Sequence, residues 1–258
     1  MNGRICVVGF DMMELIPIKG EHTMPSHAQQ TAKSFVDQIF PSCQSAILAG
    51  SASRGEETPT SDLDLVIFDE QLPPYRESFT YEGKRVEAFI HNQHSYVEDF
   101  KREKEIGRPI LGNMIKEGIL LKEHESYSAI LDAANRHVSD GPLPLNTAYI
   151  NASRYFIGDL VDDFCDAKHK QESLITLNQL SLELPDFILR LNNQWSGRGK
   201  GLSRAFYAYD KELADAFFES LDAFYRDENK EPFIQFANDI YKPLGGFLFE
   251  GFSMGKDS

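Results

Sequence analysis

The sequence predicts an α/β domain followed by an all-α domain. Between residues 46 and 91, short apolar runs bounded by Gly, Pro and polar residues have the length of buried strands. After residue 144, apolar residues recur at the three-to-four-residue spacing of amphipathic helices. The pattern changes at Gly141-Pro142-Leu143-Pro144, so we expect one domain over residues 1–140 and a second over residues 141–258. A chain of 258 residues is long enough for two domains, each with its own core.

In the first domain, short apolar runs predict strands at residues 3–9, 46–49, 62–68, 79–81 and 85–91. Residues 25–40 predict a helix, because apolar residues share one face and Ser26 is a suitable N-cap. The last two strands are separated by Glu82-Gly83, which predicts a hairpin. Helical patterns on both sides of residues 107–109 complete the domain.

In the second domain, helical spacing covers residues 145–168, 172–195, 202–207 and 214–225. Pro185 lies inside the second of these segments. Because proline lacks a backbone N–H and its ring clashes with the preceding turn, we expect it to split or kink that helix.

Net charge and composition exclude several classes of protein. A formal charge of −14 repels a polyphosphate backbone, so we expect no large nucleic-acid footprint. The same acidity would favour a cationic partner, and the alternative is that it only keeps the protein soluble. No apolar run approaches the ~20 residues of a membrane span, and no signal peptide is indicated. Three widely spaced cysteines fit reduced thiols, so the expected location is the cytoplasm.

Two aspartates lie at the start of a predicted buried strand. Alternate side chains of a strand share a face, so Asp62 and Asp64 point the same way while Leu63 faces the opposite side. Two adjacent carboxylates repel each other and raise each other's pKa unless a cation lies between them. Mg²⁺ suits such oxygen ligands and keeps coordination positions free for phosphates. The pair therefore predicts a divalent-metal site.

The turn before this strand has the features of an anion-binding loop. Gly50 permits close approach of the backbone to a bulky anion, and Ser51 offers a hydroxyl and an N–H. A short helix starting at residue 51 would add a favourable dipole. Arg54 either neutralises further phosphate charge or braces the loop by pairing with Glu56 or Glu57.

Glu87 is the best candidate for a third carboxylate. It is a lone acid within an otherwise apolar strand, and a buried acid is costly unless it binds a metal or is hydrogen bonded. It would act as a metal ligand or as general base for an acceptor hydroxyl. The alternative is a solvated glutamate on the outer face of an edge strand.

The motif Gly50-Ser51, a spacer of about ten residues, then Ser61-Asp62-Leu63-Asp64-Leu65 and a later acid resembles the nucleotidyltransferase superfamily that includes DNA polymerase β. It resembles especially the small bacterial antibiotic (aminoglycoside-type) branch, and Arg54-Gly55 lies where such enzymes often have Arg-Gly. The resemblance covers residues 46–91. It implies a mixed sheet in an α/β (α+β) catalytic domain, followed by a helical substrate-binding domain.

The resemblance also implies a mechanism. Asp62 and Asp64 would hold Mg²⁺ at the phosphates of an NTP, expected to be ATP, and Glu87 would join a second Mg²⁺ or accept the acceptor's proton. Gly50, Ser51, Arg54 and Ser61 would contact the nucleotide. Related enzymes place a basic residue of the helical domain near the triphosphate, so Lys200 or Arg198 is expected there, unless both are solvated in a turn.

The acceptor is left open by these observations. The first expectation is a small hydroxylated, cationic molecule such as an aminoglycoside-like antibiotic, which would make the chain an antibiotic-resistance enzyme. The alternatives are a protein hydroxyl, as in toxin–antitoxin modules that adenylylate a partner, or a non-catalytic nucleotide-binding module. Nucleic-acid extension is disfavoured by charge, and cyclic-dinucleotide or oligoadenylate synthesis by the lack of a supporting motif. Acids on the predicted helices, including Asp159, Asp162, Asp163, Glu172 and Glu183, would line an acceptor pocket or be solvated.

Overall fold

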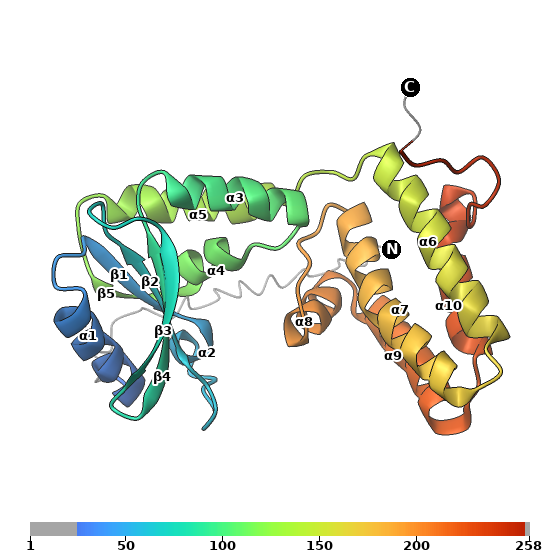
Figure 1. Cartoon of the computed structure of the whole chain (residues 1–258), viewed down its shortest axis with the longest axis horizontal. Coiled ribbons are helices and arrows are strands. Elements are labelled where there is room, and N and C mark those ends of the chain that lie inside the picture. The colour runs from blue at the N-terminus through green and yellow to red at the C-terminus, as the bar shows by residue number, and fades with distance from the viewer. Residues whose placement is uncertain (1–24, 256–258) are drawn as a thin grey trace, which may run out of the picture.

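The structure of the chain is a computed structural model that describes residues 25–255. It has two parts lying side by side (Figure 1). One part is a mixed sheet with helices on both faces, and the other consists of helices alone. This arrangement confirms the predicted fold class. The strand expected at residues 3–9 lies outside the described residues.

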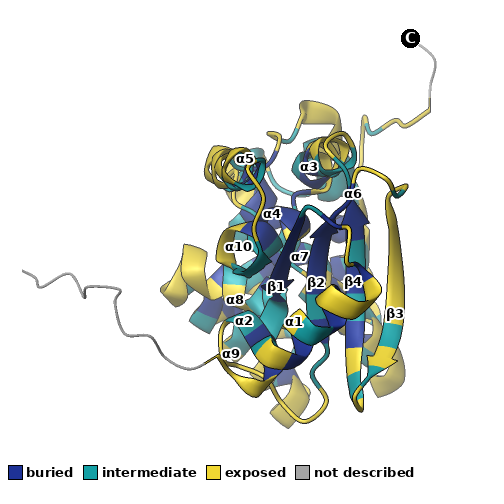
Figure 2. Cartoon of the chain, turned by 90° about the vertical axis from the view of Figure 1, so that its left-hand side faces the viewer, coloured by how far each residue is buried: buried dark blue, intermediate teal, exposed yellow. Residues whose placement is uncertain are grey.

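Within residues 25–255 the sheet has five strands: β1 (Ser45–Ala49), β2 (Leu63–Phe68), β3 (Tyr75–Tyr81), β4 (Lys84–His91) and β5 (Ile119–Lys122). Their order across the sheet is β3-β4-β2-β1-β5. β2 and β4 pair in parallel, and the other neighbouring pairs are antiparallel. The connection that makes β2 and β4 parallel passes through β3, which lies at the edge and is largely exposed (Figure 2).

The predicted hairpin is confirmed, with β3 and β4 joined at Glu82-Gly83. Both of these residues have positive φ, 49° and 75°, as the tight turn of a two-residue hairpin requires. β5 is a strand that the sequence pattern did not predict.

Each face of the sheet has its own core. Helix α1 (His27–Ile39) covers one face and packs Ala32, Phe35 and Val36 against buried side chains of β2 and β4. Ser26 caps α1 as predicted, accepting a hydrogen bond from the Gln29 N–H (3.2 Å). The other face is covered by three helices, α3 (Ser95–Ile106), α4 (Ile110–Glu117) and α5 (Tyr127–Asp140). The short helix α2 (Gly50–Ser53) follows β1 directly.

The helical part has a separate core, formed by aromatic and aliphatic residues between Ile157 and Tyr241. Its elements are α6 (Thr147–Asp166), α7 (Lys170–Leu191), α8 (Lys200–Tyr209), α9 (Lys211–Asp227), α10 (Glu231–Tyr241) and the 3₁₀ turn η1 (Lys242–Leu244). Helix α10 was not predicted. Of the two expectations for Pro185, the split is wrong, because Pro185 lies buried inside the continuous helix α7, and the kink stays a prediction. Burial of its ring in the core offsets the backbone hydrogen bond that proline cannot make.

Hydrogen bonds join the two parts at one end of α7. The buried Arg190 guanidinium donates to the carbonyls of Glu105 and Leu143, both at 3.2 Å. The Trp195 indole N–H donates to the Val138 carbonyl (2.8 Å), and the Ser196 N–H donates to the Gly107 carbonyl (2.8 Å). These contacts fix the helical part against the ends of α3 and α5. None of the helices in the described part of the chain combines the length and apolarity of a membrane span.

Candidate active site

The three candidate carboxylates lie at one end of the parallel strand pair. Asp64 in β2 is directly opposite Glu87 in β4, and Asp62 precedes β2 by one residue. Leu63 and Leu65, which alternate with the aspartates, are buried in the core beneath α1. The predicted alternation along the strand is therefore observed, and the register brings Glu87 beside Asp64.

The environment of Asp64 disfavours its charged form. Burial and the neighbouring negative charges of Asp62 and Glu87 raise the pKa of Asp64 to about 6. The positive charges of Arg76 and Arg54 only partly offset this shift. A carboxylate that repels its neighbours in this way is favoured to bind a cation.

Gly50 allows the backbone to lie against Asp64. Its φ is +69°, and a Cβ at this position would lie 2.0 Å from Asp64 Oδ2. Both the left-handed backbone and the close approach therefore require glycine. Ser51 follows in the first turn of α2, so the predicted Gly-Ser turn and the acidic strand form one continuous site.

Glu87 is paired with an arginine that the sequence did not single out. The Arg76 guanidinium in β3 lies 2.5 Å from Glu87 Oε2 and 4.7 Å from the centroid of the Phe89 ring. β3 is the edge strand, so Glu87 in β4 is not on an outer edge and its side chain is only 24% exposed. No local pattern reveals this pair, because the hairpin register alone decides which residues meet.

The loop after α2 is braced by ion pairs. Arg54 lies 3.4 Å from Glu56 and 3.4 Å from Glu117 at the end of α4, so the bracing role considered for Arg54 is observed. The Ser61 hydroxyl accepts a hydrogen bond from the Thr58 N–H (2.9 Å) and thereby closes a turn immediately before Asp62.

A cleft of about 710 Å³ lies between the two parts of the chain. Arg54, Glu117 and α4 line it on the side of the sheet, and Trp195, Arg198 and Arg204 line it from the helical part. Lys200 is the first residue of α8 and is exposed, but it is not among the residues lining the cleft.

The predicted nucleotide contacts of Ser61 and Lys200 stay predictions. Arg204 was missed, because nothing in an amphipathic helix marks one arginine as facing a cleft.

The donor set fits magnesium held jointly with a substrate. In residues 25–255 no three His, Cys, Asp or Glu side chains are arranged as a complete metal-binding group. Mg²⁺ commonly uses one or two protein carboxylates and completes its coordination shell with water and phosphate oxygens. Asp62 and Asp64 supply such a pair, and the Gly50 backbone leaves no side chain over it.

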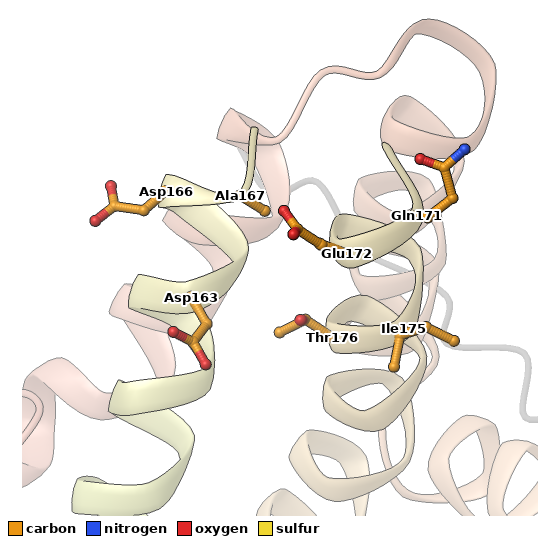
Figure 3. Close-up of a pocket in the computed structure, with 7 residues that line it drawn as sticks. All are labelled: Asp163, Asp166, Ala167, Gln171, Glu172, Ile175 and Thr176. Atoms are coloured by element: carbon orange, nitrogen blue, oxygen red, sulfur yellow. The ribbon is translucent and has the colours of Figure 1, made fainter. Parts of the chain in front are cut away.

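Acidic grooves occur on the helical part. One groove of about 680 Å³ lies between the end of α6 and the start of α7, with Asp163 and Asp166 on one helix and Glu172 on the other (Figure 3). A smaller one of about 250 Å³ is lined by Tyr149, Glu183 and Asp186 among other residues. The first lies at the turn between the two helices, which is the end remote from the sheet (Figure 1).

Residues 30–122 match the family model described as nucleotidyltransferase domain. The matched segment makes up most of the α/β part of this chain, which is therefore similar to that family. The match extends from α1 to the end of β5 and includes Gly50, Asp62, Asp64 and Glu87. It supports nucleotidyl transfer as the general activity and an NTP as substrate, and it does not distinguish the antibiotic-modifying branch.

Among solved structures, the chain is similar to the nucleotidyltransferase-like protein from Exiguobacterium sibiricum 255-15, with 12% identity and a TM-score of 0.41. That alignment covers 81% of this chain and 71% of the other. No curated protein matches the chain.

Proposed function

We propose that this chain is a Mg²⁺-dependent nucleotidyltransferase that moves a nucleoside monophosphate from an NTP, with ATP as the expected donor, to a hydroxyl of a small acceptor. The observation that supports this most is the environment of Asp64, which has Glu87 directly opposite and the Gly50 backbone against its carboxylate. Asp62 and Asp64 would hold the metal, which when bound would supply positive charge to the phosphates.

In the proposed reaction the acceptor hydroxyl oxygen attacks the α-phosphorus in line. The bond from the α-phosphorus to the oxygen bridging the β-phosphate breaks, and pyrophosphate leaves. The hydroxyl proton passes to a carboxylate or to solvent, and Glu87 would accept it once it is released from Arg76. Catalysis then depends on positioning and on charge neutralisation, without a covalent enzyme intermediate.

A cationic, hydroxylated small molecule is the acceptor that fits the charge of the chain. The net charge is −14, and the smaller groove on the helical part is lined by Glu183 and Asp186. Amine groups of an aminoglycoside-like compound would be attracted to such a surface.

The test combines binding with turnover. Titration calorimetry of each NTP with and without Mg²⁺ is expected to show binding that needs the metal. Pyrophosphate release is then measured with a panel of aminoglycosides, lincosamides and neutral polyols, and we expect release with at least one cationic member. If NTP binding needs the metal but none of the small acceptors in the panel gives pyrophosphate release, the small-molecule assignment is contradicted. The search would then turn to a protein hydroxyl.

A further inference from the structure

Basic residues gather in the interdomain cleft of a strongly acidic chain. The residues that carry charge along its lining are Arg54, Arg108, Arg198, Arg204, Glu56 and Glu117. Arginines therefore outnumber acids here, although Asp and Glu outnumber Lys and Arg by 40 to 26 in the whole sequence. A cavity of about 710 Å³ with this lining suits an anion of the size of a nucleotide polyphosphate.

One carboxylate oxygen joins the two sides of this cleft. Glu56 Oε2 lies 3.4 Å from Arg54 Nε and 3.3 Å from the Arg204 guanidinium. Arg54 belongs to the α/β part and Arg204 to α8 of the helical part, so a single glutamate holds arginines from both. The pKa of Glu56 is lowered by these two partners, first by the hydrogen bond from Arg54 and then by the charge of Arg204.

One of the two arginines held by Glu56, Arg54, is close to the acidic site. Arg54 is the C-cap of α2, the helix that begins at Gly50, and its positive charge is among those acting on Asp64. A nucleotide whose α-phosphate lay at Asp64 would therefore extend its remaining phosphates toward Arg54. Arginine binds phosphate through two parallel hydrogen bonds, a geometry that a single carboxylate oxygen does not satisfy.

The ion pairs of Glu56 are weak enough to be displaced. The side chains of Arg54, Glu56 and Arg204 are 36%, 47% and 56% exposed. Ion pairs between exposed side chains contribute little to stability because water and salt screen them. A polyphosphate offers several anionic oxygens and would compete effectively with one glutamate.

We propose that Arg54 and Arg204 bind the polyphosphate of the donor nucleotide, and that Glu56 is a built-in competitor that occupies both arginines until the nucleotide displaces it. This inference rests on the proposed function for the identity of the ligand. It assigns to Arg204 the contact that the helical part makes with the triphosphate. It also means that Glu56 weakens nucleotide binding rather than supporting it.

The test compares Glu56→Gln with Glu57→Gln. Both variants remove one negative charge from neighbouring exposed positions, so the control accounts for general electrostatics. Calorimetry with inorganic tripolyphosphate, without divalent metal, should give a Kd about fivefold lower for Glu56→Gln. Glu57→Gln should stay within about twofold of the parent chain. Equal or weaker binding by Glu56→Gln than by Glu57→Gln would overturn the proposal.

Two further measurements identify the arginine and separate this inference from the proposed function. Arg204→Gln should weaken tripolyphosphate binding, and adding Glu56→Gln to it should recover less affinity than Glu56→Gln gives alone. In the complete reaction, Glu56→Gln should lower the KM for NTP and leave kcat unchanged. If Asp64→Asn left turnover intact while Glu56→Gln still tightened tripolyphosphate binding, the proposed function would fail and the anion site would stand. If Asp64→Asn abolished turnover but Glu56→Gln did not tighten tripolyphosphate binding, the competitor role of Glu56 would be wrong and the proposed function would remain supported.

Discussion

Asp64 and Glu87 are register partners on the parallel strands β2 and β4, and this pairing brings into contact two acids that are 23 positions apart in the sequence. Two carboxylates on adjacent strands, with Asp62 beside them, repel each other in the folded chain. A bound cation would recover the free energy of this repulsion, so the proposed chemistry predicts that metal binding stabilises the domain.

The contact between Gly50 and Asp64 predicts a position-specific effect of alanine. Gly50→Ala places a Cβ 2.0 Å from Asp64 Oδ2 at a φ of +69°, whereas Gly55→Ala has a φ of +70° and nothing within 4 Å. Both variants should suffer backbone strain of about 1 kcal/mol. Gly50→Ala should cost roughly 1–2 kcal/mol more, because the Asp64 carboxylate must move.

Urea unfolding of the two alanine variants measures this difference, and calorimetry reports NTP binding. Only Gly50→Ala should lose Mg²⁺-dependent binding. Equal stability and equal binding in the two variants would show that the close approach does not matter.

The raised pKa of Asp64 predicts the pH dependence of stability. The pKa of Asp64 is about 6 in the folded chain, whereas the ordinary pKa of an aspartate is 3.8, so the folded state binds the proton more tightly. Raising the pH from 4 to 6 should therefore lower the free energy of unfolding, by at most about 2 kcal/mol after allowance for solvent screening. The free energy of unfolding of Asp64→Asn should not decrease in this way, so this variant should be more stable than the parent chain above pH 6.

Unfolding in EDTA at several pH values tests this effect, with the difference between parent and variant isolating Asp64 from other titrating groups. Mg²⁺ should then stabilise the parent chain but not Asp64→Asn. Parallel pH profiles for the two proteins would rule out the proposed repulsion.

The pair of Arg76 with Glu87 predicts competition with the metal. If Glu87 becomes a ligand or a base, the Arg76 guanidinium must leave it, so Arg76→Gln should lower the half-saturating Mg²⁺ concentration about two- to threefold. Lys84→Gln, in the same hairpin, removes an equal charge and serves as the control. An unchanged or higher Mg²⁺ requirement in Arg76→Gln would argue against competition at Glu87.

Glu103 in α3 stabilises the start of α4 from within the core. It accepts hydrogen bonds from the N–H groups of Leu111 and Gly112, and its Oε2 lies 2.8 Å from His137 Nε2. Burial lowers the pKa of His137 to about 4, so the imidazole is neutral at pH 7. Glu103→Ala leaves these donors unpaired and should destabilise the chain by about 2–4 kcal/mol.

The exposed Glu105 is the matched control for Glu103, and Glu105→Ala should change the free energy of unfolding by less than about 0.5 kcal/mol. Denaturant unfolding compares the two variants. Similar stabilities would mean that the buried carboxylate contributes nothing net to α4.

Local sequence patterns predicted the parts of the fold that depend on local interactions. The Ser26 cap, the hairpin turn at Glu82-Gly83 and the strand containing Asp64 each have a signal within a few residues. β5 was missed because the three apolar residues after Gly118 do not differ from a continuation of α4. The split at Pro185 was wrongly expected because the burial of this proline depends on tertiary packing, which no local rule contains.

The candidate site shows the same division. Asp62, Asp64 and Gly50 were found from their spacing, and Glu87 from its isolation within an apolar strand. Arg76 and the Glu56–Arg204 pair could not be found in this way. The first depends on the register of the hairpin, and the second joins residues 148 positions apart.

The most direct measurement of the central claim is pyrophosphate release from an NTP by the intact chain with Mg²⁺ and a reactive acceptor. Asp159→Asn in α6 is the control, because it removes one exposed aspartate of the helical part. We predict that Asp64→Asn lowers kcat by at least about 10³-fold with the fold retained, while Asp159→Asn stays near the parent rate. Full turnover by Asp64→Asn would contradict the account.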